Sequence, residues 1–183
     1  MGKFIKIIIR GGFMDFIELV KSRYSCKNFS EKEVEKEKLD LILEAGRLAP
    51  TAKNMQIQRI YVAKSDAALR KIDELTPCRY KAPLVLLVAF DESEAFVYPG
   101  EKYNSGVEDA TIVASHMVLA AASQGVDSCW VNFFDPDKAH EKFSLPKNEK
   151  IIAMIDLGYK NEGVKPLENH NKRKNIEETV RFI

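Results

Sequence analysis

The sequence predicts one α+β domain in which helices and strands are interspersed along the chain. Residues 84–90 (LVLLVAF) form a continuous apolar run just after a proline, and such a run is typical of a central strand covered on both faces. Residues 107–124 are apolar around most of a helical circumference, which is typical of a helix buried on several sides. The remaining apolar residues repeat with the periods of helices or short strands, without an internal repeat or a low-complexity linker.

Composition limits the kind of partner that we expect. The 183 residues are 45% hydrophobic and carry a formal net charge of +1, which fits one compact domain and gives no overall attraction to nucleic acid or anionic lipid. No stretch approaches the roughly 20 apolar residues of a membrane span. The cysteines, Cys26, Cys78 and Cys129, form neither a CxxC motif nor a metal-binding spacing, which favours reduced thiols in a cytoplasmic protein.

The first 13 residues are predicted to be a flexible extension ahead of the domain. They are basic and slightly apolar, but the apolar run covers only residues 7–9 and no small-residue cleavage site follows, so a signal peptide is not expected. The first helix is predicted at residues 16–21 and the second at residues 36–48, each from an apolar stripe at helical spacing. Pro50 ends the second helix, because the residue before a proline is forced out of the helical region.

The rest of the chain gives further elements, with two helix starts marked by capping residues. In order they are a strand at 58–63, a helix from the Ser65 cap to residue 75, the strand at 84–90, a loop at 91–106, the helix at 107–124, a strand at 128–132, a helix from Asp135-Pro136 to residue 143, and a strand at 150–157. Long loops in compact domains are often functional. The end of the chain is basic at residues 172–174 and then amphipathic.

Most signatures of catalytic side chains are absent from the sequence. There is no strand-borne GxGxxG, no GxxxxGK[ST], no HExxH and no GxSxG. His116 lies in the apolar helix, where a core or interface histidine is the simpler interpretation, and Cys129 is most simply a buried small hydrophobe. We therefore expect no metal site, and we expect any difficult chemistry to belong to a bound cofactor.

The segment Arg23-x-Ser25-x-Lys27 places two cations and a hydroxyl at alternate positions. On an extended chain these side chains share one side, which suits a phosphorylated ligand. Taken alone, the pattern is more typical of a solvated polar face, and the basic triplet at residues 172–174 is similarly ambiguous. Two local basic clusters in a near-neutral chain favour a small anionic ligand over a polymer.

These motifs, taken together, resemble the FMN-dependent nitroreductase superfamily from about Met14 to the end of the chain. RYSCKNF (23–29) is similar to the family's Arg-x-Ser-x-Arg/Lys-x-Phe, and APTAKNMQ (49–56) to its Ala-Pro-Ser/Thr-x-x-Asn-x-Gln. LAAASQGVDSCWV (119–131) is similar to its Leu-Ala-Ala…Gly-Leu-x-Ser/Thr-x-Trp, and LGY (157–159) and RKNIEE (173–178) follow. Each motif is moderately specific, and their shared order carries the resemblance.

The resemblance implies a three-layer α+β fold for residues 14–183, with a central, mostly antiparallel sheet flanked by helices. It also implies an intertwined homodimer with two FMN molecules at its interface and the helix at 107–124 in the dimer core. Arg23 and Arg173 would hold the FMN phosphate with Lys172, and Ser25 would contact the phosphate or the ribityl chain. Lys27 would reach N1 and the C2 carbonyl of the ring, where reduced flavin carries negative charge that a cation stabilises.

The resemblance implies further contacts, and the sequence also departs from the family. The remaining cofactor contacts would be Pro50, Thr51, Asn54 and Gln56 from the partner subunit, and the backbone groups of Asn132 and Phe133 near the reactive edge of the ring. The family often continues its second motif as Gln-Pro-Trp, whereas this chain has Gln-Ile-Gln at residues 56–58. Tyr98 and Tyr103, in the loop at 91–106, are candidates to stack over the flavin, although surface aromatics on a mobile loop explain them equally well.

The function that the resemblance implies is a ping-pong oxidoreductase. NADH or NADPH would deliver a hydride to flavin N5 and leave, and a small acceptor such as a nitroaromatic, a quinone or a second flavin would then be reduced. No catalytic side chain is expected, because the flavin is the redox centre. One alternative is a flavin-binding sensor or storage module without useful turnover. Another is a relative that reductively dehalogenates aromatics or fragments flavin.

Overall fold

The computed structural model describes residues 6–9 and 12–183. At the N-terminus, β1 (Lys6–Ile9) pairs antiparallel with β2 (Gly12–Asp15), which crosses the end of the predicted extension. Residues 1–5, 10 and 11 lie outside the described part of the chain. The flexibility of residues 1–13 therefore stays a prediction.

A four-stranded antiparallel sheet forms the centre of the molecule. Its strands follow the spatial order β3 (Gln58–Ala63), β4 (Leu84–Asp91), β6 (Glu149–Gly158) and β5 (Asp127–Val131). All 8 residues of β4 are buried, as the apolar run at 84–90 predicts for a central strand. The register pairs Leu84 with Leu157 at one end of β4 and Phe90 with Gln58 at the other.

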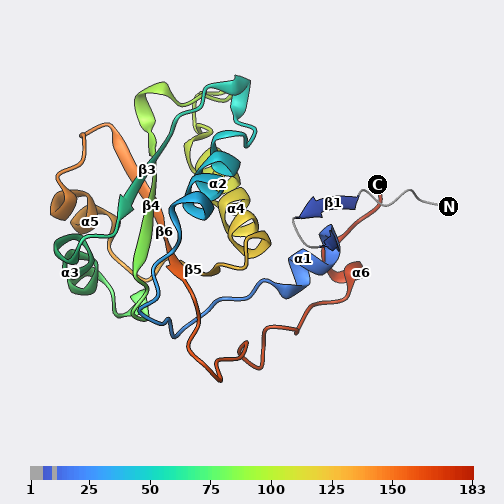
Figure 1. Ribbon diagram of the computed structural model, residues 1–183. Helices are drawn as coiled ribbons and strands as arrows, with labels where there is room; N and C mark the ends of the chain where they lie inside the picture. Colours follow the sequence, from blue (N-terminus) through green and yellow to red (C-terminus); the bar gives the residue numbers. More distant parts are fainter. Residues whose placement is uncertain (1–5, 10–11) are drawn as a thin grey trace.

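Helices cover both faces of this sheet and make the molecule a three-layer α+β fold, as predicted. Figure 1 shows α2 (Lys36–Arg47) and α4 (Gly106–Ser123) on one side of the sheet, and α3 (Asp66–Leu75) and α5 (Pro136–Phe143) on the other. One core cluster joins α2 and α4 to the sheet through residues such as Ile42 and Met117. A second cluster on the opposite face includes Ile72 and Met154.

Local capping sets several of these boundaries. The Ser65 hydroxyl accepts a hydrogen bond from the Ala68 amide at 3.2 Å, which caps α3 as the sequence predicts. The Asp135 carboxylate accepts the amides of Asp137 and Lys138 at 3.0 and 3.2 Å, and proline occupies the first turn of α5. The predicted loop at 91–106 contains a short 3₁₀ helix, η3 (Glu92–Glu94). Two more 3₁₀ turns, η1 (Ala52–Asn54) and η2 (Pro77–Arg79), were not predicted from the sequence.

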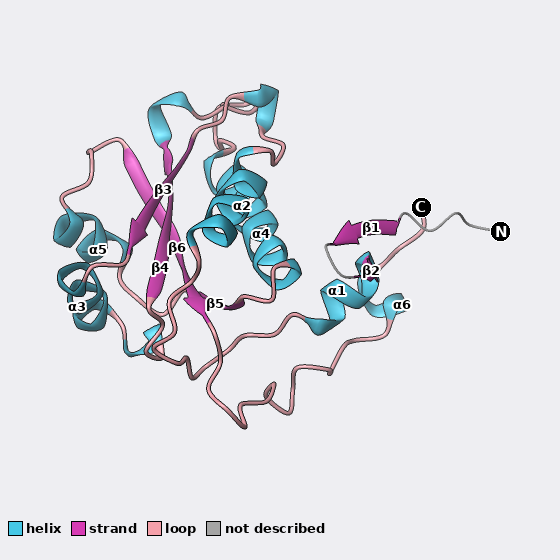
Figure 2. Ribbon diagram, viewed as in Figure 1, coloured by secondary structure: helices cyan, strands magenta, loops and turns pink. Residues whose placement is uncertain are grey.

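Both ends of the domain leave the sheet as long, mostly irregular segments (Figure 2). They contain α1 (Phe16–Ser22) and α6 (Ile176–Thr179). They touch where the Tyr24 and His170 rings pack edge to face, with 6.1 Å between the ring centroids. The large apolar side chains exposed on these segments are Phe16, Ile17, Val20, Leu167, Ile176, Val180, Phe182 and Ile183. Apolar surface of this extent is typical of segments that pack against another molecule.

Candidate functional site

The RYSCKNF segment lies across the ends of β5 and β6, where its backbone continues the sheet. Ser25 forms a parallel bridge with Ser128 of β5, and the Cys26 amide donates to the Ser128 carbonyl at 2.9 Å. Phe29 forms an antiparallel bridge with Lys160, just beyond β6. Asn161 completes the attachment, because its Nδ2 donates to the Phe29 carbonyl at 2.9 Å.

Burial along this segment distinguishes anchoring side chains from outward-facing ones. Cys26 and Phe29 are 0% and 1% exposed and belong to the core, whereas Ser25 is half-buried and Lys27 is exposed. Phe29 approaches Gly158 so closely that a Cβ there would stand 3.0 Å from the Phe29 ring. The segment thus presents Ser25 and Lys27 on a backbone that the core holds in place.

Three of the predicted cofactor residues line one cavity. This cavity has a volume of about 300 Å³. Its lining consists of Tyr24, Ser25, Lys27, Leu167, Asn169, His170 and Arg173. The Arg173 guanidinium is turned onto the carbonyls of its own segment, including that of Lys172 at 2.8 Å, and among the described residues it has no carboxylate partner. A hydroxyl, an ammonium group and a guanidinium around one cavity are suited to an anionic group.

Arg23 lines an adjoining cavity, which shares Tyr24 with the first. This cavity has a volume of about 260 Å³ and also contains Ser128, Asp127 and Lys160. The Tyr24 hydroxyl is buried without a hydrogen-bond partner among the described residues. Burial, followed by the Asp127 carboxylate, raises the pKa of Tyr24 to about 12. Tyr24 therefore stays neutral at physiological pH. Its side chain lines both cavities.

The second predicted motif lies at the opposite end of the sheet. Pro50, Thr51, Asn54 and Gln56 lie between α2 and β3, next to the end of β4 at Phe90 rather than its start at Leu84. Lys53, Asn54 and Gln56 have φ values of 49°, 56° and 53°. Left-handed conformations in residues other than glycine cost about 1–3 kcal/mol each and are concentrated at functional sites.

Contacts within the loop and to its neighbours hold this backbone. The Gln56 amide donates to Thr51 Oγ1 at 3.0 Å, and the Ala52 amide donates to Asp109 Oδ1 at 2.8 Å. Lys53 Nζ lies 4.3 Å from the centroid of the Phe96 ring. In one chain, this loop and the cationic cavities do not form a common site.

The remaining predicted residues have mixed environments. Asn132 follows β5 and donates from Nδ2 to the Ile152 carbonyl at 3.0 Å, while Phe133 is 73% exposed. The Tyr98 hydroxyl donates to Glu108, which raises the Tyr98 pKa to about 12. Tyr103 is 73% exposed, and its carbonyl accepts the Tyr98 amide at 2.9 Å, closing the tip of the 91–106 loop. Neither tyrosine lines the cationic cavities.

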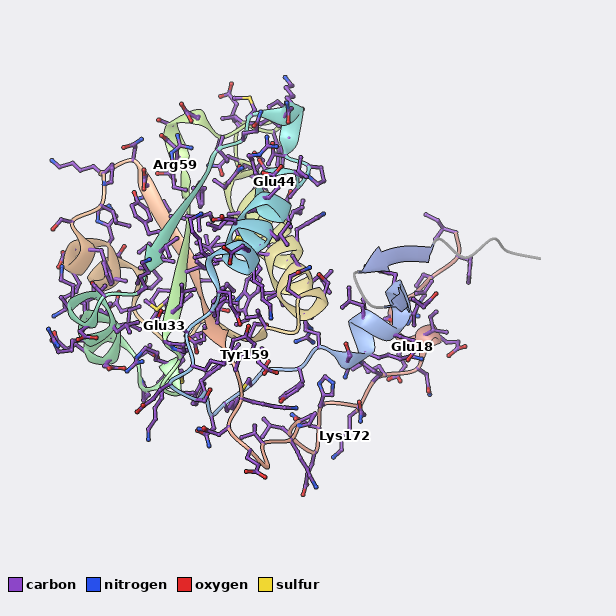
Figure 3. The ribbon with its side chains drawn as sticks, in the orientation of Figure 1. Glu18, Glu33, Glu44, Arg59, Tyr159 and Lys172 are labelled. Atoms are coloured by element: carbon purple, nitrogen blue, oxygen red, sulfur yellow. The ribbon has the colours of Figure 1, made fainter. Side chains whose placement is uncertain are left out.

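Sequence reasoning missed several lining residues and left Lys172 in an ambiguous position. Figure 3 shows Lys172 on the C-terminal segment away from the sheet, and it does not line the cavity beside Arg173. Tyr24, Lys160 and His170 were not predicted. Tyr24 lies inside the first motif and Lys160 directly follows LGY, so proximity to the motifs was the available signal. His170 is recognisable only from the three-dimensional arrangement.

The side chains around these cavities fit the phosphate and polar chain of FMN. Arginine and lysine donate charge-assisted hydrogen bonds to phosphate oxygens, and Ser25 supplies a hydroxyl in the same cavity as Lys27 and Arg173. Across residues 6–9 and 12–183, no group of histidine, cysteine and acidic side chains is arranged to hold a metal ion. Within that same part of the chain, no helix combines the length and apolarity that crossing a bilayer requires.

Comparison with known families agrees with this arrangement. The model of the nitroreductase family matches residues 20–80 and 77–159, which include the first three motifs and LGY. The chain belongs to the nitroreductase family. This membership accounts for the order of the motifs and for the three-layer fold.

Individual relatives agree over most of the chain. A nitroreductase family protein from Clostridium difficile 630 is 38% identical, with a TM-score of 0.87 over 92% of this chain and 98% of its own. An FMN-dependent nitroreductase from Clostridium difficile R20291 is 28% identical, with a TM-score of 0.72 over 91% of this chain and 98% of its own. A Methanothermobacter thermautotrophicus protein, provisionally named NADH dehydrogenase/NAD(P)H nitroreductase, is 29% identical over 87% of this chain and 82% of its own.

Proposed function

We propose that this protein is an FMN-dependent oxidoreductase that passes electrons from NADH or NADPH to a small acceptor in a ping-pong cycle. Nitroaromatics and quinones are the proposed acceptor classes, and residues 14–183 are the proposed FMN-binding domain. The observation that carries the proposal is the convergence of Ser25, Lys27 and Arg173 on one cavity in a chain of the nitroreductase family. The names of the C. difficile R20291 and M. thermautotrophicus relatives support the cofactor and the electron donor, respectively.

The proposed roles of the side chains follow from their positions. Arg173 and Arg23, in adjoining cavities, would bind the phosphate, with Lys172 contributing charge from the neighbouring position. Ser25 would donate to the phosphate or the ribityl chain. Lys27, exposed on the outward side of the segment, would place its ammonium group beside the N1 edge of the ring, where negative charge accumulates on reduction.

Bound FMN would supply the hydride acceptor and the electron donor of the reaction. The protein's task would then be to bind the cofactor, orient its ring and exclude water. A cation at the N1 edge favours the reduced state, because it compensates the negative charge in a site of low dielectric. Asn132 and Phe133 would line the reactive edge, and the exposed Phe133 ring would offer an apolar surface for a planar acceptor.

A complete site on this plan requires two copies of the chain. Within one chain the 51–56 loop and the cationic cavities lie at opposite ends of the sheet. A homodimer with antiparallel subunits would bring the loop of each subunit to the cavity of the other. The exposed apolar residues of α1 and α6, together with Val107 and Ile112 on α4, support such a contact. A cytoplasmic location also stays a prediction.

The direct test is the colour and redox behaviour of the purified protein. We expect bound FMN with visible flavin absorbance, bleaching by NADH or NADPH under anaerobic conditions, and recovery of the absorbance when a nitroaromatic is added. A colourless protein that also fails to bind added FMN would refute the proposal. FMN that binds but is not reduced at a useful rate would support a storage or sensing role instead.

Variants at the cavity test the assignment of individual cations. Replacing Arg173 or Arg23 with alanine removes a charge-assisted hydrogen bond worth roughly 1.5–3 kcal/mol, which corresponds to about a 10- to 150-fold increase in the Kd for FMN. Lys174→Ala is the matched control. It removes the same charge at the next position, and the Lys174 side chain does not line the cavity. Equal effects of R173A and K174A on the Kd would show that only general charge matters.

A further inference from the structure

The loop between α2 and β3 has a backbone that its own sequence does not favour. Lys53, Asn54 and Gln56 adopt left-handed φ values of 49°, 56° and 53°, a conformation that glycine occupies far more readily than residues with a Cβ. The loop contains no glycine between Thr51 and Gln56. Hydrogen bonds within the loop, together with contacts from outside it, therefore stabilise this conformation.

Asp109 makes the side-chain hydrogen bond that ties this loop to the core. Its Oδ1 accepts the Ala52 amide at 2.8 Å, across 57 positions of sequence. The other contacts do not tie the loop to a helix or strand: the bonds of the Asn54, Met55 and Gln56 amides are internal to the loop, and the Lys53 ammonium group lies over the Phe96 ring. Ala52 begins η1, so a bond to its amide fixes the point where the loop turns.

The environment of Asp109 is unusual for an acid in the first turn of a helix. Acidic residues at this position normally interact with the helix dipole from the surface, as the exposed Glu108 does on the adjacent position of α4. Asp109 is instead 3% exposed, and its Oδ2 is buried without a partner among the described residues. Burying a carboxyl group without full hydrogen bonding is unfavourable, so α4 stability alone does not account for this residue.

We propose that Asp109 is a positioning residue of the cofactor site: through the Ala52 amide it holds the 51–56 loop in the left-handed conformation that presents Thr51 and Asn54 to the flavin. This inference rests on the proposed function, since that function assigns the loop to the cofactor. The loop itself, however, is held or released independently of any ligand. The two claims can therefore be tested separately.

The first readout is tryptic cleavage after Lys53 in the full-length protein, followed by mass spectrometry. Lys53 is exposed, and cleavage there requires the loop to leave its held conformation. We expect Asp109→Ala to raise the cleavage rate at least 10-fold and the Kd for FMN about 10-fold. Asp109→Asn keeps an acceptor oxygen for the Ala52 amide and should remain within about 3-fold of the natural protein in both measurements.

Two further variants separate positioning from general loss of stability. Ala52→Pro removes the donor from the other side of the bond while leaving Asp109 in place, and proline is compatible with the first position of a helical turn. Val113→Ala is the control, because it removes buried apolar volume one turn further along α4. We expect A52P to match D109A, whereas V113A should lower the melting temperature without changing Lys53 cleavage or FMN affinity.

The outcomes distinguish the inference from the proposed function. The positioning role would be overturned if D109A had the same rate of cleavage after Lys53 and the same Kd for FMN as the natural protein. Equal effects of D109A and V113A on these two measurements would also overturn it. If D109A does not fold, A52P decides the question in its place. If the natural protein binds no FMN, the proposed function fails, and the cleavage readout still determines whether Asp109 holds the loop.

Discussion

Replacing Asp156 with asparagine should stabilise the protein at neutral and alkaline pH. Asp156 lies in β6 opposite Val85 and Cys129, is 1% exposed, and has an Oδ2 without a hydrogen-bond partner among the described residues. The Arg79 guanidinium partly opposes the effect of burial, but it is already bonded to Asp73 at 2.6 and 2.7 Å. Burial dominates and raises the pKa of Asp156 to about 9.

The magnitude follows from proton linkage. In the unfolded chain an aspartic acid has a pKa of about 3.9, so above that pH the unfolded state loses its proton while the folded state keeps it up to about pH 9. The stability associated with the protonated carboxyl is complete below the unfolded pKa and declines as pH rises, by at most about 1.36 kcal/mol per pH unit. From pH 5 to pH 8 the free energy of unfolding can therefore fall by at most about 4 kcal/mol. An asparagine side chain does not titrate and contributes no such pH dependence.

Urea unfolding of the natural protein and D156N at pH 5, 6, 7 and 8 would measure this difference. We expect the free energy of unfolding of the natural protein to fall relative to D156N by about 1 kcal/mol per pH unit. Glu162→Gln, at an exposed carboxyl group, is the control and should leave the pH profile unchanged. Parallel profiles for the natural protein and D156N would refute the reasoning, because they would show that Asp156 gains no protonation on folding.

Two further substitutions and one labelling experiment have defined outcomes. Gly158→Ala would place a Cβ 2.7 Å from Pro83 and 3.0 Å from the Phe29 ring, and we expect the free energy of unfolding in urea to fall by about 1–3 kcal/mol, together with weaker FMN binding. Unchanged FMN affinity would contradict a role of this packing in holding the RYSCKNF segment. Gly106→Ala would place a Cβ 2.1 Å from the Phe90 ring, so the melting temperature of this variant should be lower than that of the natural protein. An unchanged melting temperature would contradict the close packing of Gly106 against Phe90. Burial raises the pKa of Cys129 to about 12, so the thiol should react with a disulfide reagent only after unfolding, and rapid labelling of the folded protein would contradict its burial.

The central sheet could be predicted because its signals are local. The continuous apolar run of β4 reflects its burial, and the Ile, Tyr and Val residues of β3 reflect strand propensity, so each strand is indicated by its own sequence. The caps at Ser65 and Asp135 are equally local, since each side chain bonds amides two or three positions away. Element boundaries consequently agree within one or two residues.

The site was less predictable because its contacts are between distant parts of the chain. The motifs identified Ser25, Lys27 and Arg173, yet nothing in their spacing shows that Arg173 reaches the cavity of Ser25 across the sequence. The bond from Ala52 to Asp109 and the left-handed backbone of the 51–56 loop also have no periodic signature. Such features depend on which surfaces the fold brings together, and a single sequence reports them only through resemblance.

The separation of the loop and the cationic cavities at opposite ends of the sheet has a consequence for cofactor retention. If each FMN is held by two subunits, release of the cofactor and dissociation of the subunits are linked equilibria, and each must depend on the concentration of the other component. Dilution would then lower the apparent affinity for FMN, and excess FMN would favour association. The flavin absorbance of a dilution series would therefore measure subunit assembly as well as cofactor binding.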